Sequence, residues 1–371
     1  RYNIGRLELR AGVTLAGARG MTVLRTSGIE ASGVADIGLE DLVVMGRGQA
    51  ADGSRGLLAI ADCQRVHLAG LRIEGSAGHG IGLARTSGRV IACEVAGAAA
   101  AGIFSIDATG LEITSCHVRD CANNGILVWR SAPGDDGTLV HANRIERIRS
   151  DAGGSGQNGN GVNVFRAGGV VVSANRITDC AYSAVRANAA ADVQMIANNI
   201  ARIGEVALYA EFAFSGAIIS GNVIDGAAAG ISVTNFNEGG RLAVVDGNLI
   251  RNLARREHEP VDKRGEGIAV EADATVTGNV IEGAPTAGIV VGWGRYMRDC
   301  NVSANVIRGA RVGIAVSADS DAGTCLVGGN LISGAMEGGI RAMRHGRLLG
   351  PDLIRQPSES RRIVVAGNVA S

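Results

Sequence analysis

The 371-residue chain contains 56 glycines, 46% hydrophobic residues and only 3% aromatic residues, and its formal net charge is zero. This apolar content without a charge imbalance is not typical of a disordered chain, and it gives no basic surface for nucleic-acid binding. The glycine content disfavours a helical bundle, because each glycine inside a helix costs about 1 kcal/mol. We therefore expect many short strands around a core of small and branched aliphatic side chains.

No apolar stretch approaches the ~18 residues that a membrane-spanning helix needs. The longest stretch, residues 95–106, consists mostly of alanine and glycine. We expect no transmembrane segment.

A repeated asparagine motif runs through most of the chain. Asn recurs two residues before an aliphatic residue, mostly at intervals of 22 to 27 residues, and Cys116, Cys93 and Leu71 continue the frame towards the N-terminus. An amide side chain tolerates the left-handed backbone of a tight corner and can bond to the equivalent amide one coil away, so we expect an Asn ladder. Its members are Asn143, Asn175, Asn198, Asn222, Asn248, Asn279, Asn305, Asn330 and Asn368.

A second motif, usually Gly-Ile-x-Val, alternates with the first and occurs in twelve units. A period of this length with short alternating strands is typical of a parallel β-helix, in which each coil packs only on its neighbours. The sequence therefore predicts an all-β, single-stranded parallel β-helix of twelve or thirteen coils, forming one domain over residues 1–371. We expect residues 1–46 to form the first coils, and residues 344–371 to form an irregular loop and a last strand.

The seven cysteines show no Cys-x-x-Cys spacing, and the six histidines show no zinc-binding pattern. Cys93 and Cys116 fall at equivalent positions of adjacent coils, as do Cys300 and Cys325. We expect small buried thiols, although the spacing leaves disulfide pairing open. We expect no metal site and no cofactor.

The repeat is interrupted by two insertions at the same corner of the coil, residues 149–160 and 251–266. The outward strand positions between them carry aromatic, arginine and amide side chains, which predict a groove that binds an oligosaccharide, with an acidic sugar favoured by the arginines. The alternative is that these side chains only cover a long sheet. The candidate binding residues are Trp129, Arg130, Asn163, Phe165, Arg166, Asn188, Phe212, Asn235, Phe236 and Trp293.

Long strings in and around these interruptions resemble a known family. They include NNGILVWRSAPGDDGTLV (residues 123–140), GNGVNVFRAG (159–168) and TAGIVVGWGRYMRD (286–299). The chain resembles the twin-arginine-translocated repeat proteins of bacteria, an uncharacterised family with a pectin-lyase-like right-handed β-helix. The resemblance implies a right-handed coil and export of the folded protein to the periplasm or beyond, although the signal segment is not in this chain. It implies no established reaction, so no catalytic residue is carried over.

Two kinds of sugar chemistry fit the outward residues. Arg186 and Tyr209 occupy one column on adjacent coils, where Arg could neutralise a sugar carboxylate and Tyr could remove a proton, as elimination or epimerisation requires. Glu211 and Glu271 share a column two coils apart, about 10 Å, which is compatible with inverting glycoside hydrolysis. The alternative for Glu211 is an ion pair with Arg186.

The sequence thus predicts polysaccharide recognition, with Glu211, Tyr209, Arg186 and Glu271 as candidate catalytic residues for an added lyase, epimerase or hydrolase step. A non-catalytic polysaccharide-binding or structural envelope protein is the alternative. The sequence does not predict the sugar, the linkage or the oligomeric state.

Overall fold

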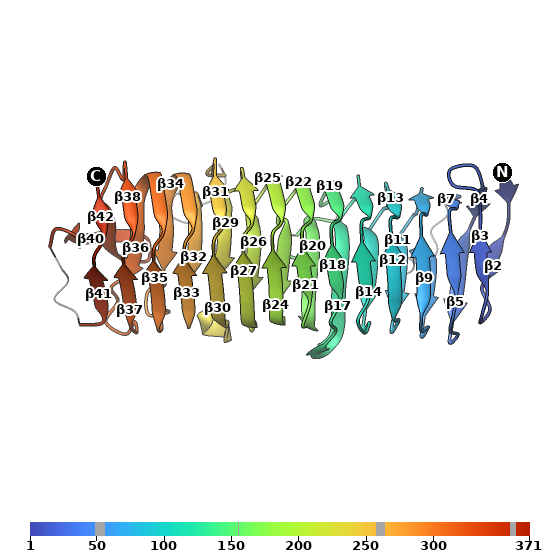
Figure 1. The fold of residues 1–371 in the computed structure, drawn as a ribbon, viewed down its shortest axis with the longest axis horizontal. Helices are drawn as coiled ribbons and strands as arrows, with labels where there is room; N and C mark the ends of the chain where they lie inside the picture. The colour runs from blue at the N-terminus through green and yellow to red at the C-terminus, as the bar shows by residue number, and fades with distance from the viewer. Residues whose placement is uncertain (49–55, 155, 257–263, 357–360) are drawn as a thin grey trace. The chain divides into compact units, whose positions relative to one another are not determined.

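The computed structural model describes residues 1–48, 56–154, 156–256, 264–356 and 361–371. The chain divides into two compact units, Arg1–Val185 and Arg186–Ser371, and each is described by itself. In both units every complete coil contains three short strands, and each strand pairs in parallel with its counterpart in the next coil (Figure 1). We call the three resulting strand sets the first, second and third columns. This is the predicted all-β parallel solenoid.

The first unit has seven strands in its first column among the described residues: β2 (Arg6–Glu8), β5 (Gly28–Ser32), β8 (Gly56–Ala61), β11 (His79–Ala84), β14 (Ala101–Ile106), β17 (Asn124–Asp135) and β20 (Asn160–Gly168). Its second column consists of β3 (Thr14–Ala16), β6 (Gly38–Glu40), β9 (Val66–Ala69), β12 (Gly88–Ile91), β15 (Glu112–Thr114), β18 (Leu139–His141) and β21 (Val171–Ser173). Its third column consists of β1 (Tyr2–Asn3), β4 (Val23–Thr26), β7 (Val43–Gly46), β10 (Arg72–Glu74), β13 (Glu94–Ala96), β16 (His117–Arg119), β19 (Arg144–Ile148) and β22 (Arg176–Cys180).

In the second unit the first column contains β26 (Val206–Glu211), β29 (Ala229–Val233), β32 (Glu266–Val270), the later parts of β34 (Val280–Val291) and β36 (Val306–Ser317), and β39 (Ile340–Arg344). The column begins with residues 186–188, which belong to β23 (Val185–Asn188). The second column is β24 (Ala191–Ile196), β27 (Ser215–Ser220), β30 (Arg241–Asp246), β33 (Ala274–Thr277), β35 (Cys300–Ser303), β37 (Cys325–Gly328) and β41 (Ile363–Ala366). The third column is β25 (Asn199–Ile203), β28 (Val223–Asp225), β31 (Leu249–Arg251), the earlier parts of β34 and β36, β38 (Leu331–Ser333) and β42 (Val369–Ala370).

One element departs from the solenoid. Residues 344–362 were expected to be irregular, but β40 (Arg347–Asp352) turns back and pairs antiparallel with β39. A reversal of direction breaks the coil period, so a repeat-based prediction passes over it. Among the described residues no helix is long and apolar enough to cross a membrane.

The predicted Asn ladder is present and buried. In the second unit Asn222 donates from its backbone N and from Nδ2 to Asn248 Oδ1, at 3.0 and 2.9 Å. The same two bonds join Asn248 to Asn279, at 2.9 Å each. In the first unit Asn143 bonds to Asn175 in the same way, and Cys116, which holds a ladder position, donates its backbone N to Asn143 Oδ1 at 2.8 Å. From Asn143 onwards the ladder amides therefore hold neighbouring coils of each unit in register, whereas Leu71 and Cys93 occupy the ladder position nearer the N-terminus and supply no amide.

The left-handed residue at the ladder corner is not the asparagine, contrary to expectation. It is the residue immediately before it, as in Ala197 (φ 56°), Gly278 (φ 64°) and Ala304 (φ 56°). The asparagines keep an ordinary backbone, which leaves their amides aligned along the ladder.

The glycine of the Gly-Ile motif has a different role. A Cβ at Gly230 would lie 2.4 Å from the Gly267 carbonyl oxygen and 2.8 Å from Ile250 Cγ2. This position therefore requires glycine because neighbouring coils approach closely there, and not because its φ is positive.

All seven cysteines are buried free thiols, as expected. Cys300 and Cys325 are direct neighbours in β35 and β37. Burial raises the pKa of the Cys300 thiol to about 12, so this group is protonated at neutral pH.

The ladder predicts a position-dependent loss of stability. Asn279→Ala should lower the free energy of unfolding by roughly 2–5 kcal/mol, because two buried donors of Asn248 lose their acceptor. Asn368→Ala should cost less, because Asn368 is half-buried and water can replace its oxygen. Urea denaturation followed by circular dichroism measures both, and equal losses would contradict a burial-dependent ladder.

The corner geometry predicts a stabilising substitution. Ala304→Gly should raise the free energy of unfolding by about 0.5–1 kcal/mol, because relief of left-handed strain outweighs the greater backbone entropy of glycine. Gly278→Ala, at the equivalent corner, should lower it by a similar amount. Thermal melts of the two variants test the sign, and a destabilised Ala304→Gly protein would refute the assignment.

Candidate functional site

The first unit carries an aromatic row on the outer side of its first column. Phe104, Trp129 and Phe165 come from β14, β17 and β20, with successive ring centroids 5.5 and 5.7 Å apart. Asn163 Oδ1 accepts a bond from Trp129 Nε1 at 2.9 Å, and the Arg166 guanidinium lies 4.6 Å from the Phe165 ring centroid. Four of the predicted binding residues are thus brought together: Trp129, Asn163, Phe165 and Arg166.

His79 extends this row at one end. Its ring centroid is 4.6 Å from that of Phe104, and its Nδ1 accepts a bond from Ala101 N at 3.2 Å. Burial lowers the pKa of His79 to about 4, so the imidazole is neutral at neutral pH and completes an uncharged stack.

A hollow of about 300 Å³ lies beside Phe104, in β14. Small outward residues, including Ala59 and Gly82, form its floor, and Glu30 and Arg85 line it. Arg130, by contrast, is half-buried and donates from Nη1 to the Ala108 carbonyl at 3.3 Å, so part of its guanidinium is used within the protein.

In the second unit Arg186 and Glu211 form a buried bidentate ion pair. Arg186 Nε and Nη2 lie 2.6 and 2.7 Å from the two carboxylate oxygens of Glu211, which is 1% exposed. Asn188 Nδ2 adds a third bond to Glu211 Oε1 at 2.8 Å. The ion pair that was the alternative interpretation of Glu211 is therefore formed.

The pair belongs to a larger buried charge cluster. Arg186 Nη1 lies 3.7 Å from Glu205 Oε2, and Arg264 Nη2 lies 3.0 Å from Glu205 Oε1. Tyr209 packs its ring 5.0 Å from the Arg186 guanidinium. Burial, reinforced by the Glu211 carboxylate, raises the pKa of Tyr209 to about 12, so its hydroxyl stays protonated at neutral pH.

Glu271 has a different environment from Glu211, although the strand register places the two in one column with a single strand between them. One of its carboxylate oxygens accepts a bond from Phe236 N at 2.6 Å. Burial raises the pKa of Glu271, and hydrogen bonds from the backbone N–H groups of Phe236 and Asn235 oppose this rise. A carboxyl group with a raised pKa can accept a hydrogen bond from a hydroxyl group when it is ionised, and can donate one to it when it is protonated.

A pocket of about 220 Å³ opens beside Glu271 on the outer side of β26, β29, β32 and β34. Its floor is apolar, and its polar wall comes from the ends of these strands and the segments that follow them. The lining side chains that can contact a ligand through polar or aromatic groups are Ser232, Thr234, Asn235, Arg264, Glu266, Glu271 and Trp293.

The loops after the strands position Asn235, Phe236 and Trp293. Asn235 (φ 72°) begins the 3₁₀ turn Phe236–Glu238, and its Oδ1 accepts a bond from Phe212 N at 3.3 Å. The Arg298 guanidinium lies 4.6 Å from the Phe236 ring. Trp293 and Tyr296 exchange two backbone hydrogen bonds of 3.1 Å, which close the loop.

Sequence reasoning missed several residues of this site. Arg264 and Glu266 lie at the end of the second insertion, of which residues 257–263 fall outside the described part. Glu205 lies two residues before the start of a Gly-Ile-type motif, one position earlier than Asn124 and Asn160 lie in other coils, so the aligned column did not include it. His345, whose ring lies 5.7 Å from Trp293, comes from the β39–β40 turn and had no repeat signal.

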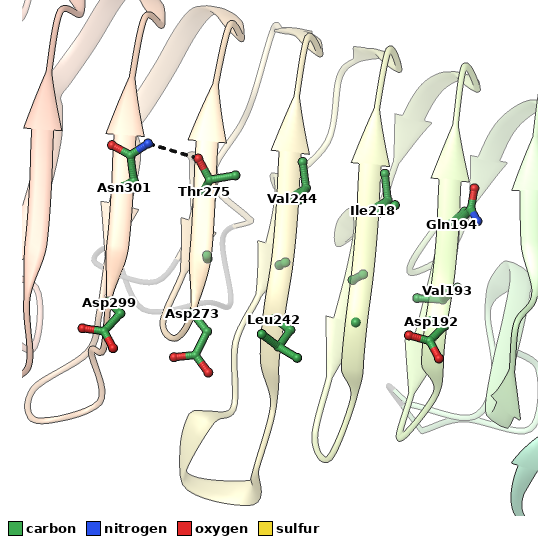
Figure 2. A pocket seen from close by; sticks show the side chains of 14 residues that line it. Asp192, Val193, Gln194, Ile218, Leu242, Val244, Asp273, Thr275, Asp299 and Asn301 are labelled. Carbon is green, nitrogen blue, oxygen red and sulfur yellow. Dashed lines mark hydrogen bonds between the residues drawn. The ribbon is translucent and has the colours of Figure 1, made fainter.

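A larger concave surface of about 660 Å³ lies on the second column of the second unit. Figure 2 shows Asp192, Leu242, Asp273 and Asp299 in one row and Gln194, Ile218, Val244, Thr275 and Asn301 in the other. Arg298 Nε and Nη2 donate to the two carboxylate oxygens of Asp273 at 2.7 and 2.6 Å. This interaction lowers the pKa of Asp273. The surface has aliphatic side chains but no aromatic ring, so it lacks a stacking platform. In the described part of the chain no group of three or more His, Cys, Asp or Glu residues could hold a metal ion.

The coiling of the chain, its three parallel strand columns and its Asn ladder define a right-handed parallel β-helix. The family described as right handed beta helix region matches residues 12–145 and 133–301, more than half of the chain, and the protein belongs to this family. No curated protein shows significant sequence similarity to it.

Solved structures share the fold at low identity. Bacteriophage phi29 gene product 12, in its pre-mature form, is 16% identical with a TM-score of 0.50 over 99% of this chain, which spans only 52% of that protein's chain. The periplasmic alginate epimerase AlgG is 12% identical with a TM-score of 0.49, over 99% of this chain and 77% of that one. PfbA, a surface adhesin of Streptococcus pneumoniae, is 12% identical with a TM-score of 0.43, over 85% of each chain. At these identities the similarity extends to the fold and not to a reaction.

The buried ion pair predicts a large and specific loss of stability. Glu211→Gln should lower the free energy of unfolding by about 3–5 kcal/mol, because the buried Arg186 charge loses its bidentate carboxylate and keeps only the more distant carboxylate of Glu205. Asp225→Asn removes a carboxylate from the exposed Arg251–Asp225 pair and should cost about 1 kcal/mol or less. Urea denaturation compares the two, and the double variant Arg186→Met/Glu211→Leu should recover most of the loss. A single-variant loss as small as that of Asp225→Asn would show that the pair is not desolvated.

Proposed function

We propose that the protein recognises a polysaccharide on the outer face of its first strand column. The observation that carries the proposal is the pocket of about 220 Å³ that Trp293, Glu271, Thr234 and Asn235 line together. An indole face stacks on the apolar face of a sugar ring, while carboxyl, hydroxyl and amide groups bond to its hydroxyls.

The size and direction of the pocket support a chain of sugars. Its volume lies somewhat below the ~300–1,000 Å³ of a typical drug-sized site, which suits a short part of a sugar chain. Its lining comes from successive strands, β26 to β34, so a longer ligand would run across the strands. The groove predicted between residues 149–160 and 251–266 includes residues of both units. We therefore propose the aromatic row of the first unit separately, as a second surface for the same class of ligand.

An exposed arginine in the Trp293 loop supports an acidic sugar. Arg295 is exposed, and its guanidinium lies 5.2 Å from the Tyr296 ring, next to the Trp293 loop. Arg186 is already matched by carboxylates within the protein, so Arg295 is the better candidate to bind a sugar carboxylate. Export to the periplasm or beyond is part of the proposal and rests on the family resemblance alone.

Recognition is better supported than turnover. For elimination or epimerisation, Tyr209 would have to act as a base with a pKa near 12, and Arg186 would have to leave Glu211. For inverting hydrolysis, Glu211 would need access to water or to the glycosidic oxygen, but it is 1% exposed and bonded through both oxygens. New unsaturated products or new reducing ends on incubation with a polyuronate or a neutral glucan would favour these alternatives.

Binding should depend on Trp293. Trp293→Ala should weaken binding of a soluble polyuronate at least tenfold, since aromatic stacking contributes about 0.5–1.5 kcal/mol beyond the area that it buries. Isothermal titration with a polyuronate and with a neutral glucan measures the effect and identifies the class of sugar. Met336→Ala, at an exposed site 78% accessible to solvent, is the control and should bind like the unmodified protein. Equal affinities for all three proteins would refute the proposed site.

A further inference from the structure

The outer face of the first column is open at one end of the second unit and covered at the other. The strand register aligns one outward position across successive strands: Tyr209, Ser232, Ala269, Val290 and Ala315. Tyr209 and Ser232 are half-buried, whereas Val290 and Ala315 are 7% and 4% exposed. Outward residues at the C-terminal end are therefore shielded from solvent.

The β39–β40 hairpin provides this cover. Leu348 of β40 packs against an apolar cluster that includes Val290, Ala315 and Met343. The space left between the hairpin and the sheet, lined by Trp293, Val312 and Leu348 among others, is only about 20 Å³. Such a void is close to the minimum that holds one water molecule, so no sugar ring fits there.

Trp293 lies at the boundary between the open and covered parts, because it lines both the larger pocket and the small void. On the covered side the His345 ring meets the Trp293 ring edge to face, with centroids 5.7 Å apart and an interplanar angle of 74°. The Gly294 carbonyl accepts a bond from Ser317 Oγ at 2.5 Å, which fixes the same loop to β36.

We infer that this face binds the end of a polysaccharide chain and not its interior. The terminal sugar lies in the Trp293 pocket against the hairpin, and the following sugars extend over β32 and β29 towards Tyr209. From β34 back to β26 there are three strand spacings, about 14 Å, which accommodate a short oligosaccharide. The inference rests on the proposed function and specifies the part of the polymer that the site recognises.

The test measures stoichiometry against chain length. Size-fractionated polyuronates, and neutral glucans of matched length, are titrated with the protein, and each is also prepared with both ends blocked by a bulky fluorophore. End recognition predicts a fixed number of proteins per chain at every length, and at least a tenfold loss of affinity after blocking. A stoichiometry that rises in proportion to length, with blocked chains bound equally well, would overturn the inference and leave the proposed function intact. No binding to either polymer would overturn both.

A variant that opens the covered end provides the second arm. His345→Gly/Leu348→Ser should restore binding of blocked chains and make the stoichiometry increase with length, because the barrier beyond Trp293 is removed. Arg347→Ala, an exposed change in the same hairpin, is the matched control and should keep end recognition. Unfolding of the hairpin would also open this end of the face. The double variant therefore still tests the inference when circular dichroism shows a local loss of structure. Unchanged rejection of blocked chains by the double variant would contradict the role of the hairpin.

Discussion

The structure depends on the register between neighbouring coils, which the buried Asn ladder fixes. A ladder amide receives two bonds from the coil before it, as Asn248 does from Asn222, and gives two to the coil after it. A slip by one residue would turn every inward side chain outward. Because buried amides cannot be left unpaired without a large cost, the ladder excludes such slips and lets small aliphatic residues suffice for the core.

The same register determines what can be built on the outside. Once equivalent positions align from coil to coil, an arginine in one coil lies beside a carboxylate in the next. Corner pairs such as Arg65–Asp36 and Arg298–Asp273 are bidentate, which a lysine could not reproduce. This is a structural reason for arginine, and not lysine, at these corners. The Arg186–Glu211 pair follows the same rule on a strand, where burial turns a surface interaction into one whose loss is costly.

The fold could be predicted from the sequence because it is periodic. The Asn spacing located the ladder, and the Gly-Ile alignment placed Arg186, Tyr209 and Glu211 in adjacent coils. Alignment alone could not show that Glu211 is buried and bonded to both Arg186 and Asn188, since burial depends on side-chain conformations. Nor could it find contacts outside the period: Arg264 reaches Glu205 across 59 residues, and His345 reaches Trp293 from a hairpin that reverses the chain.

Function in such a fold has to come from departures from repetition. A uniform column of outward residues would offer the same surface at every coil and would have no defined start or end. In the second unit the column changes from Tyr209 and Ser232 to Ala269, Val290 and Ala315, so a polar, open surface becomes a small and apolar one. Within that apolar part, Val290 and Ala315 line the small void beneath the hairpin, and Ala269 lines the open pocket. The change in composition and the added hairpin therefore coincide, and Trp293 lies where they meet, because it lines both the open pocket and the small void.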